Sequence, residues 1–304
     1  MFLGDELTAV LDAIENDKPY NGSGKSVMKL GVHVLPRFFR DTTDRNRTSP
    51  FAFTGNKFEF RMLGSSNSIA CANIMLNAAV AESLKIYADR LEQAEDFESA
   101  LHEMIKQTIR DHKRIIFNGN GYDDAWIAEA EKRGLCNLTS TADALPMYTA
   151  KKNVDLFVNH GIYTEAEIRA RAEIHVENYS TVIAIEANTM VDMIRHDILP
   201  AVSAYATDLC ERADSKSALG VSSKYETVTA KSVAELTDTL LDACDKLEAD
   251  VAATPADAKE AMAYSHDVIL ADMTAARAAA DKLEAITAKE YWPFPVYSDL
   301  LFSV

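Results

Sequence analysis

The hydrophobic pattern of this chain changes once, near residue 68, and that change limits the folds open to it. Upstream, apolar residues gather in three short strand-like runs, KLGVHVL (29–35), SPFAFT (49–54) and KFEFRML (57–63). Downstream, the apolar residues from Ile69 to Leu91 recur at spacings of three and four, which is the period of a helix. The sequence therefore predicts a few short strands followed by helices.

Capping and breaking signals place the individual helices. A capping box of Thr164 and Glu167 opens a long segment with an apolar stripe, which Pro200 is expected to bend or break. Alanine is abundant toward the C-terminus, and this suits long antiparallel helices that pack closely. The expected helices cover about residues 4–15, 68–91, 96–116, the segment after 164, and 255–288.

Three short strands are too few to make a sheet of their own. They would leave unpaired edges and a face that is only half covered. We therefore expect them to be the last strands of a sheet whose other strands lie elsewhere, and we expect the chain to begin inside a domain. The predicted fold class is α+β, predominantly α.

The charge balance excludes several classes of partner. The 304 residues include 47 acidic and 31 basic side chains, which give a formal net charge of −16. A field of this sign repels nucleic acid and anionic membranes, so neither is an expected partner. It does not exclude a small anionic substrate, because a few arginines can keep a pocket locally positive.

Neither a membrane segment nor a disulfide framework is expected. No apolar run reaches the roughly 18 residues of a membrane helix, and the start MFLGDELTAVL lacks the basic region of a signal peptide. The four cysteines, Cys71, Cys136, Cys210 and Cys244, lie far apart with no CxxC spacing. This spacing favours buried free thiols over disulfides or a zinc site, and it predicts a cytoplasmic location.

Two glycine-containing loops and an aromatic tail carry less specific signals. GSGKS (22–26) lacks the first glycine of a phosphate-binding loop, because Pro19 stands there, and a surface loop is the better interpretation. FNGNGYDDAW (117–126) is better read as a helix stop, a turn and a new helix capped by Asp123 than as a nucleotide loop. EYWPFPVYSDLL (290–301) covers either its own domain or another subunit.

The run KFEFRML places three charges on one face of a strand. Successive side chains of a strand point to opposite faces, so Lys57, Glu59 and Arg61 share one face while Phe58 and Phe60 share the other. An amphipathic strand with a solvated face explains this pattern. A carboxylate between two cations is also typical of phosphate and carboxylate chemistry, because Glu offers hard oxygen to Mg²⁺ and Arg clamps anionic groups with two prongs.

This charged run lies within DRNRTSPFAFTGNKFEFRMLGSS (44–66), which resembles the late catalytic-domain signature of glutamine synthetase in the large type III form. Downstream, IIFNGNGYDDAWIAEAEKRGL, VNHGIYTEAEI and ENYSTVIAIEANTMVDMIRHDILPA resemble the C-terminal helical region of that type. The resemblance implies that residues 1–80 end a catalytic domain and carry the last strands of its β-barrel. It implies that residues 81–304 form a large antiparallel helical C-terminal domain.

The family resemblance also implies an activity and roles for four residues. Glutamate would be phosphorylated by ATP and then converted to glutamine by ammonia, with Mg²⁺ or Mn²⁺ as cofactor, in a homo-oligomeric ring. The roles that it implies are metal binding for Glu59, glutamate binding for Arg61, nucleotide binding for Lys57 and stabilisation of the transferring phosphoryl group for Arg47.

The resemblance has gaps, and they leave a second hypothesis open. The family's other metal-binding glutamates, its histidine ligand, its ammonia-site loop and its N-terminal β-domain have no counterpart in this sequence. We therefore expect a fragment that is inactive alone and that functions within a longer enzyme. The alternative is a stand-alone helical assembly module that retains remnants of the site.

Overall fold

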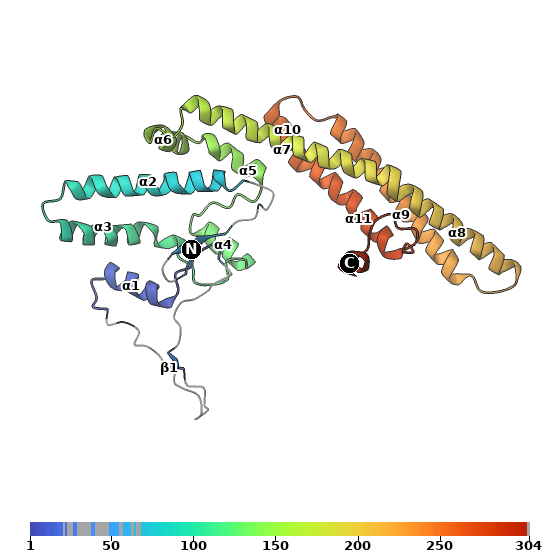
Figure 1. Cartoon of the computed structure of the whole chain (residues 1–304), viewed down its shortest axis with the longest axis horizontal. Coiled ribbons are helices and arrows are strands. Elements are labelled where there is room, and N and C mark those ends of the chain that lie inside the picture. The colour runs from blue at the N-terminus through green and yellow to red at the C-terminus, as the bar shows by residue number, and fades with distance from the viewer. Residues whose placement is uncertain are drawn as a thin grey trace. The chain divides into compact units, whose positions relative to one another are not determined.

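The computed structural model describes residues 1–20, 22, 27–28, 38–39, 49–54, 57–61, 64 and 68–302. The described chain is predominantly helical, as the sequence predicts, and it divides into two compact units (Figure 1). Unit 1 consists of residues 1–139 with 155–162, and unit 2 consists of residues 140–154 with 163–304.

The described strands form two separate antiparallel pairs. β1 (Val27–Met28) pairs with β2 (Phe38–Phe39), and β3 (Phe51–Phe53) pairs with β4 (Phe58–Phe60). The strands expected within 49–54 and 57–63 are therefore present, although they are shorter. The strand expected at 29–35 lies outside the described residues, and the barrel to which these strands would belong stays a prediction.

The first residues of the chain pair with the outer edge of β3 in the β3–β4 hairpin. The N–H of Phe2 donates to the carbonyl of Phe51 at 3.0 Å, and the N–H of Phe53 donates to the carbonyl of Phe2 at 2.9 Å. Phe2 and Ala52 form a parallel bridge and are 3% and 0% exposed. This edge gives the hairpin a buried neighbour on the β3 side.

In unit 1, helix α3 packs against two other helices. The elements are α1 (Asp5–Glu15), α2 (Ala70–Glu92), α3 (Phe97–His112), the 3-10 turn η1 (Lys113–Ile115) and α4 (Asp124–Lys132). α3 contacts both α1 and α2. Asp96 caps α3 by accepting from the N–H groups of Glu98 and Ser99, and Asp123 caps α4 as the sequence predicts.

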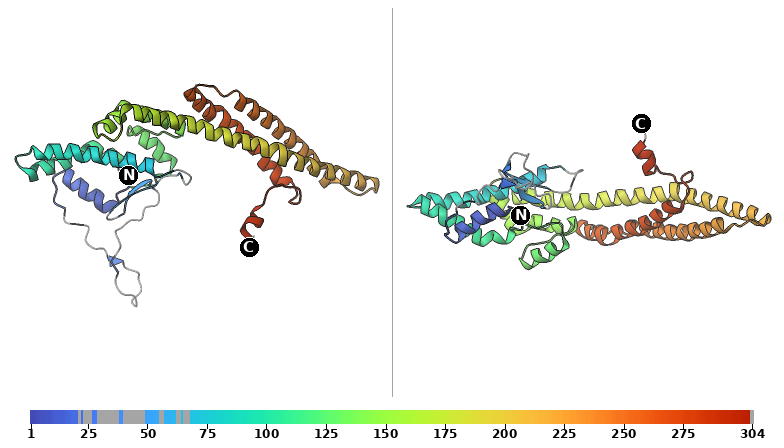
Figure 2. Two further views of the ribbon diagram at one scale, coloured as in Figure 1. Left: turned by 45° about the horizontal axis from the view of Figure 1, so that its top comes forward. Right: turned by 90° about the horizontal axis from the view of Figure 1, so that it is seen from below.

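Unit 2 contains three long helical segments that lie side by side (Figure 2). Its elements begin with α5 (Thr141–Ala144) and η2 (Leu145–Thr149), while α6 (Lys151–Asn159) spans the division between the units. The first long segment is α7 (Glu165–Met193), η3 (Ile194–Ile198) and α8 (Leu199–Ala218). The second is α9 (Lys224–Ala252), and the third is α10 (Ala258–Tyr264), η4 (Ser265–Ile269) and α11 (Leu270–Ile286).

Short connections fold these segments back on one another around one apolar core. Val202, Leu240, Leu247 and Leu283 are each 0% exposed and come from all three segments. The capping box of Thr164 and Glu167 is present at the start of α7. The expected antiparallel helical packing of this region is therefore confirmed within unit 2.

Pro200 does not break the first long segment, so of the two expected outcomes, a bend or a break, the break is wrong. A π-helical turn, η3, directly precedes it, and the N–H of Leu199 donates to the carbonyl of Ile194, five residues back. A wider turn relieves the clash between the proline ring and the preceding turn, and Pro200 has no N–H that needs a partner. The helix continues because Ile198 and Val202 on either side are buried in the core.

The aromatic C-terminal stretch divides its roles. Tyr291, Trp292 and Phe294 pack against the core of unit 2, so this half covers its own domain. α12 (Tyr297–Phe302) follows, and its Tyr297 and Phe302 side chains are 82% and 79% exposed. The sequence left open whether this stretch covers its own domain or another subunit. The first alternative holds for residues 291–294, and the second stays open only for α12.

The cysteines and the membrane criterion give two further findings. Cys71, Cys136 and Cys210 are free and exposed, so the prediction that all four thiols are buried is wrong, and only Cys244 fits it. Each exposed thiol lies on the outer side of a helix or in a loop, which their wide spacing did not indicate. No helix in the described part of the chain is long and apolar enough to cross a membrane.

Candidate functional site

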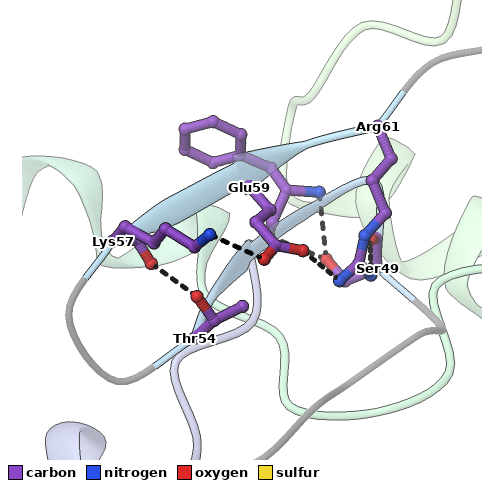
Figure 3. A network of polar contacts seen from close by, with 6 residues as sticks. Ser49, Thr54, Lys57, Glu59 and Arg61 are labelled. Carbon is purple, nitrogen blue, oxygen red and sulfur yellow. Dashed lines mark hydrogen bonds and ion pairs between the residues drawn. The ribbon is translucent and has the colours of Figure 1, made fainter.

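The candidate site lies on one face of the β3–β4 hairpin (Figure 3). A carboxylate oxygen of Glu59 accepts a hydrogen bond from Arg61 Nη2 at 2.9 Å, and its other oxygen lies 3.6 Å from Lys57 Nζ. The strand thus brings Lys57, Glu59 and Arg61 together, as the alternation of its side chains predicts. Arg47 lies outside the described residues.

Two residues that the sequence did not single out hold the ends of this row. Arg61 Nη1 donates to the carbonyl of Ser49 at 3.3 Å, and Ser49 is 4% exposed. Thr54 contacts the other end, because its N–H donates to the carbonyl of Lys57 at 2.8 Å. A polar residue before proline was the one available signal for Ser49, and it does not identify a contact twelve residues away.

The burial of the two faces departs from an ordinary amphipathic strand. The side chains of Glu59 and Arg61 are 38% and 31% exposed, and Ala52, directly opposite Glu59, is completely buried. Phe58 and Phe60 are 48% and 46% exposed. In the described part of this chain, the rings of Phe58 and Phe60 contact those of Phe51 and Phe53 in the hairpin itself.

The charges around Glu59 set its protonation. The hydrogen bond from Arg61 is the main cause that lowers the pKa of Glu59 below its ordinary value, and the charges of Lys57 and Arg61 lower it further, while partial burial opposes them. Glu59 is therefore ionised at neutral pH. Because its pKa is lowered by folding, its favourable contribution is present above the unfolded-state pKa and is lost as the pH falls through the folded-state pKa.

We expect the pKa of Glu59 to rise toward its ordinary value when Arg61 is replaced by glutamine, since the main hydrogen bond that stabilises the carboxylate is lost. Lys57→Gln should raise it by less, because Lys57 acts mainly through its charge. Carboxyl-carbon NMR titration of the purified chain measures both shifts. A larger rise in the Lys57 variant would contradict the order of causes.

The described residues of this site do not form a metal centre by themselves. Both oxygens of Glu59 already face cations, and a lone carboxylate falls short of the six or more oxygen ligands that a hard divalent cation takes. Within the described ranges, no group of three or more His, Cys, Asp or Glu side chains could hold a metal ion.

Comparison with known proteins identifies the chain's relatives. Residues 100–217 match the model of the glutamine synthetase C-terminal domain. The whole chain is 39% identical to a glutamine synthetase of Butyrivibrio fibrisolvens, and it covers 44% of that protein. It is 36% identical over 99% of its length to the type-3 glutamine synthetase of Dictyostelium discoideum, and it covers 43% of that protein.

A third relative matches the chain to a similar extent. A glutamine synthetase of Bacteroides fragilis is 34% identical over the whole chain, which covers 44% of it. The chain thus spans less than half the length of each of these relatives, and the matched domain model places that part at their C-terminal end. The chain is therefore similar over its whole length to glutamine synthetases, one of them a type-3 enzyme, and it corresponds to their C-terminal part.

Proposed function

We propose that this chain acts as the C-terminal part of an ATP-dependent glutamate–ammonia ligase. The observation that carries the proposal is the match of the entire chain to glutamine synthetases from three organisms. In the proposed reaction, the side-chain carboxylate of glutamate attacks the γ-phosphorus of ATP and ADP leaves. Ammonia then displaces phosphate from γ-glutamyl phosphate, and the products are glutamine and phosphate.

The charged row of β4 has the chemistry that such a reaction needs. We assign Arg61 to the bound glutamate, because a guanidinium holds a carboxylate with two parallel hydrogen bonds. Lys57 would lie near the nucleotide phosphates, and Arg47 would neutralise the transferring phosphoryl group. Phosphoryl transfer depends mainly on positioning and on charge neutralisation, and these cations supply both.

Glu59 is assigned as one ligand of a divalent cation, Mg²⁺ or Mn²⁺. Since the described residues supply a single carboxylate, the proposal requires further oxygen ligands from the part of the relatives that this chain does not match. When bound, the cation would neutralise phosphate charge. The half-exposed side chains of Phe58 and Phe60 support the proposal that further protein structure lies beside this strand. An apolar strand face of this kind is usually covered.

The proposal extends to organisation and location. Residues 1–80 would complete a catalytic β-barrel, and residues 81–304 would form the C-terminal helical domain of the enzyme. The complete enzyme would be a cytoplasmic homo-oligomeric ring.

We expect the 304-residue chain alone to form no glutamine, because the described residues supply one carboxylate to the proposed metal, and a single carboxylate binds Mg²⁺ weakly. Purified chain should be assayed for glutamine formation with ATP, glutamate, ammonia and Mg²⁺. The full-length Butyrivibrio fibrisolvens enzyme in the same assay is the positive control. Steady ATP-dependent glutamine production by the chain would contradict the proposal that the site is shared with missing structure.

The core of unit 2 favours a second candidate function. It is formed by residues of unit 2 alone, from Ile183 to Leu283, so the helical bundle has the core of an independent assembly module. The DNA upstream of the codon for Met1 distinguishes the candidates. An in-frame barrel with a histidine-bearing metal strand supports the enzyme, whereas a promoter and start signal at Met1 support the module.

A further inference from the structure

The turn of the FNGNGY motif contains two asparagines with different roles. The side-chain oxygen of Asn120 accepts from the N–H of Tyr122 at 3.1 Å, within its own turn. The side chain of Asn118 instead reaches the first residues of the chain. Its Oδ1 accepts from the N–H groups of Leu3 at 3.1 Å and Gly4 at 3.2 Å, and its Nδ2 donates to Thr8 Oγ1 at 2.9 Å.

The backbone beside Asn118 holds the same segment. The N–H of Phe117 donates to the carbonyl of Met1 at 2.9 Å, and the nitrogen of Met1 donates to the carbonyl of Ile115 at 2.6 Å. The Asn118 side chain continues this pairing, because it accepts from the next two N–H groups of the segment, those of Leu3 and Gly4. Leu3 is 6% exposed, so its N–H would have little access to water if Asn118 were absent.

The turn is itself firmly placed. The ring of Phe117 stacks on Trp126 at 4.1 Å, and Arg133 Nη1 donates to the carbonyl of Ile116 at 2.9 Å. A Cβ on Gly119 would lie 2.5 Å from the Phe117 ring, so any larger residue there would force that ring to shift. Because the turn is rigid, the Asn118 side chain can keep the Met1–Gly4 segment in one position.

The held segment lies directly between the turn and the candidate site. Phe2 exchanges two backbone hydrogen bonds with β3, through Phe51 and Phe53. Ala52, the β3 residue between them, stands opposite Glu59 in β4. A continuous set of paired backbones therefore connects the FNGNGY turn to the strand that carries Glu59 and Arg61.

We propose that Asn118 is a positioning residue of the candidate site, which fixes the Met1–Gly4 segment against β3 and thereby sets the position of Glu59 and Arg61. The assignment rests on the proposed function of those two residues. Asn118 does not touch the candidate site itself. It acts through paired backbone, so its loss should loosen the hairpin rather than remove a reacting group.

Amide hydrogen exchange of the purified chain tests the mechanical part of this proposal. Asn118→Ala removes three hydrogen bonds, and it should speed exchange at Phe53 and Arg61 by at least the roughly 2- to 10-fold that one bond of ordinary strength is worth. Asn120→Ala is the matched control and should leave both amides unchanged. Asn118→Asp keeps the acceptor oxygen and should restore slow exchange. Unchanged exchange at Phe53 and Arg61 in Asn118→Ala would overturn the proposal.

Kinetics of the full-length enzyme test the functional part. Asn118→Ala should raise the KM for glutamate about 3- to 10-fold, because a small displacement of Arg61 weakens its grip on the substrate. A purely structural loss would reduce the active fraction, and hence kcat, without moving KM. Asn118→Asp should recover the KM, and Asn120→Ala should not change it.

The two experiments separate the possible failures. If the unmutated full-length protein forms no glutamine, both the proposed function and the positioning role of Asn118 are overturned, whatever the exchange rates are. If the unmutated protein is active and Asn118→Ala has the same KM for glutamate, the positioning role alone is overturned. Faster exchange together with a raised KM supports both.

Discussion

Leu240→Ala is expected to lower the free energy of unfolding of unit 2 by about 2–5 kcal/mol. Leu240 lies in α9, is completely buried, and belongs to the core that all three long helical segments share. Truncation removes its apolar contacts and leaves a cavity, because the neighbouring helices pack against one another and cannot close fully onto a smaller side chain. Urea unfolding followed by circular dichroism measures the loss.

Leu241→Ala is the matched control for this prediction. It makes the same chemical change one residue further along α9, where the side chain is 38% exposed. A similar change in helix propensity applies to both variants, so the difference between them reports burial alone. Equal losses in the two variants would contradict the position of the α9 core face.

The helices of this chain were readable from local signals because those signals act within one or two turns. The capping box of Thr164 and Glu167 pairs residues three positions apart, and Asp123 caps its helix over two positions. Pro200 shows where such reasoning stops. Its local rule predicts a bend or a break, but burial of Ile198 and Val202 favours an unbroken helix with a π turn.

The charged row of the candidate site was likewise readable, since side chains alternate along any strand. Its surroundings were not. The contact of Arg61 with Ser49 depends on the hairpin register, and the contact of Asn118 with Leu3 joins residues 115 positions apart. No periodicity carries that information. The half-exposure of Phe58 and Phe60 also escaped prediction, because an apolar strand face looks the same in sequence whether or not this chain covers it.

Arg61→Lys should lower kcat/KM for glutamate in the full-length enzyme by roughly 10- to 100-fold. In the structure, one arm of Arg61 donates to Glu59 and the other to the carbonyl of Ser49. The ammonium of lysine keeps the positive charge but lacks the planar set of N–H donors of a guanidinium. It therefore cannot bind the substrate carboxylate with two parallel hydrogen bonds. Hydrogen bonds of this charged kind are worth about 1.5–3 kcal/mol, which corresponds to that range of rates.

Steady-state kinetics with glutamate varied, together with a melting curve and a size measurement, decide the role of Arg61. Arg169→Lys is the matched control, because Arg169 also binds a glutamate, Glu165, through two nitrogens, but on the exposed surface of α7. This control should change neither activity nor melting. Arg61→Lys should melt like the unmutated enzyme, since Arg61 is partly exposed and the core of unit 2 does not include it. Unchanged kcat/KM would show that Arg61 does not belong to the site. Loss of folding or assembly would show that Arg61 is a structural residue, because replacing a group that only binds substrate leaves the substrate-free enzyme folded.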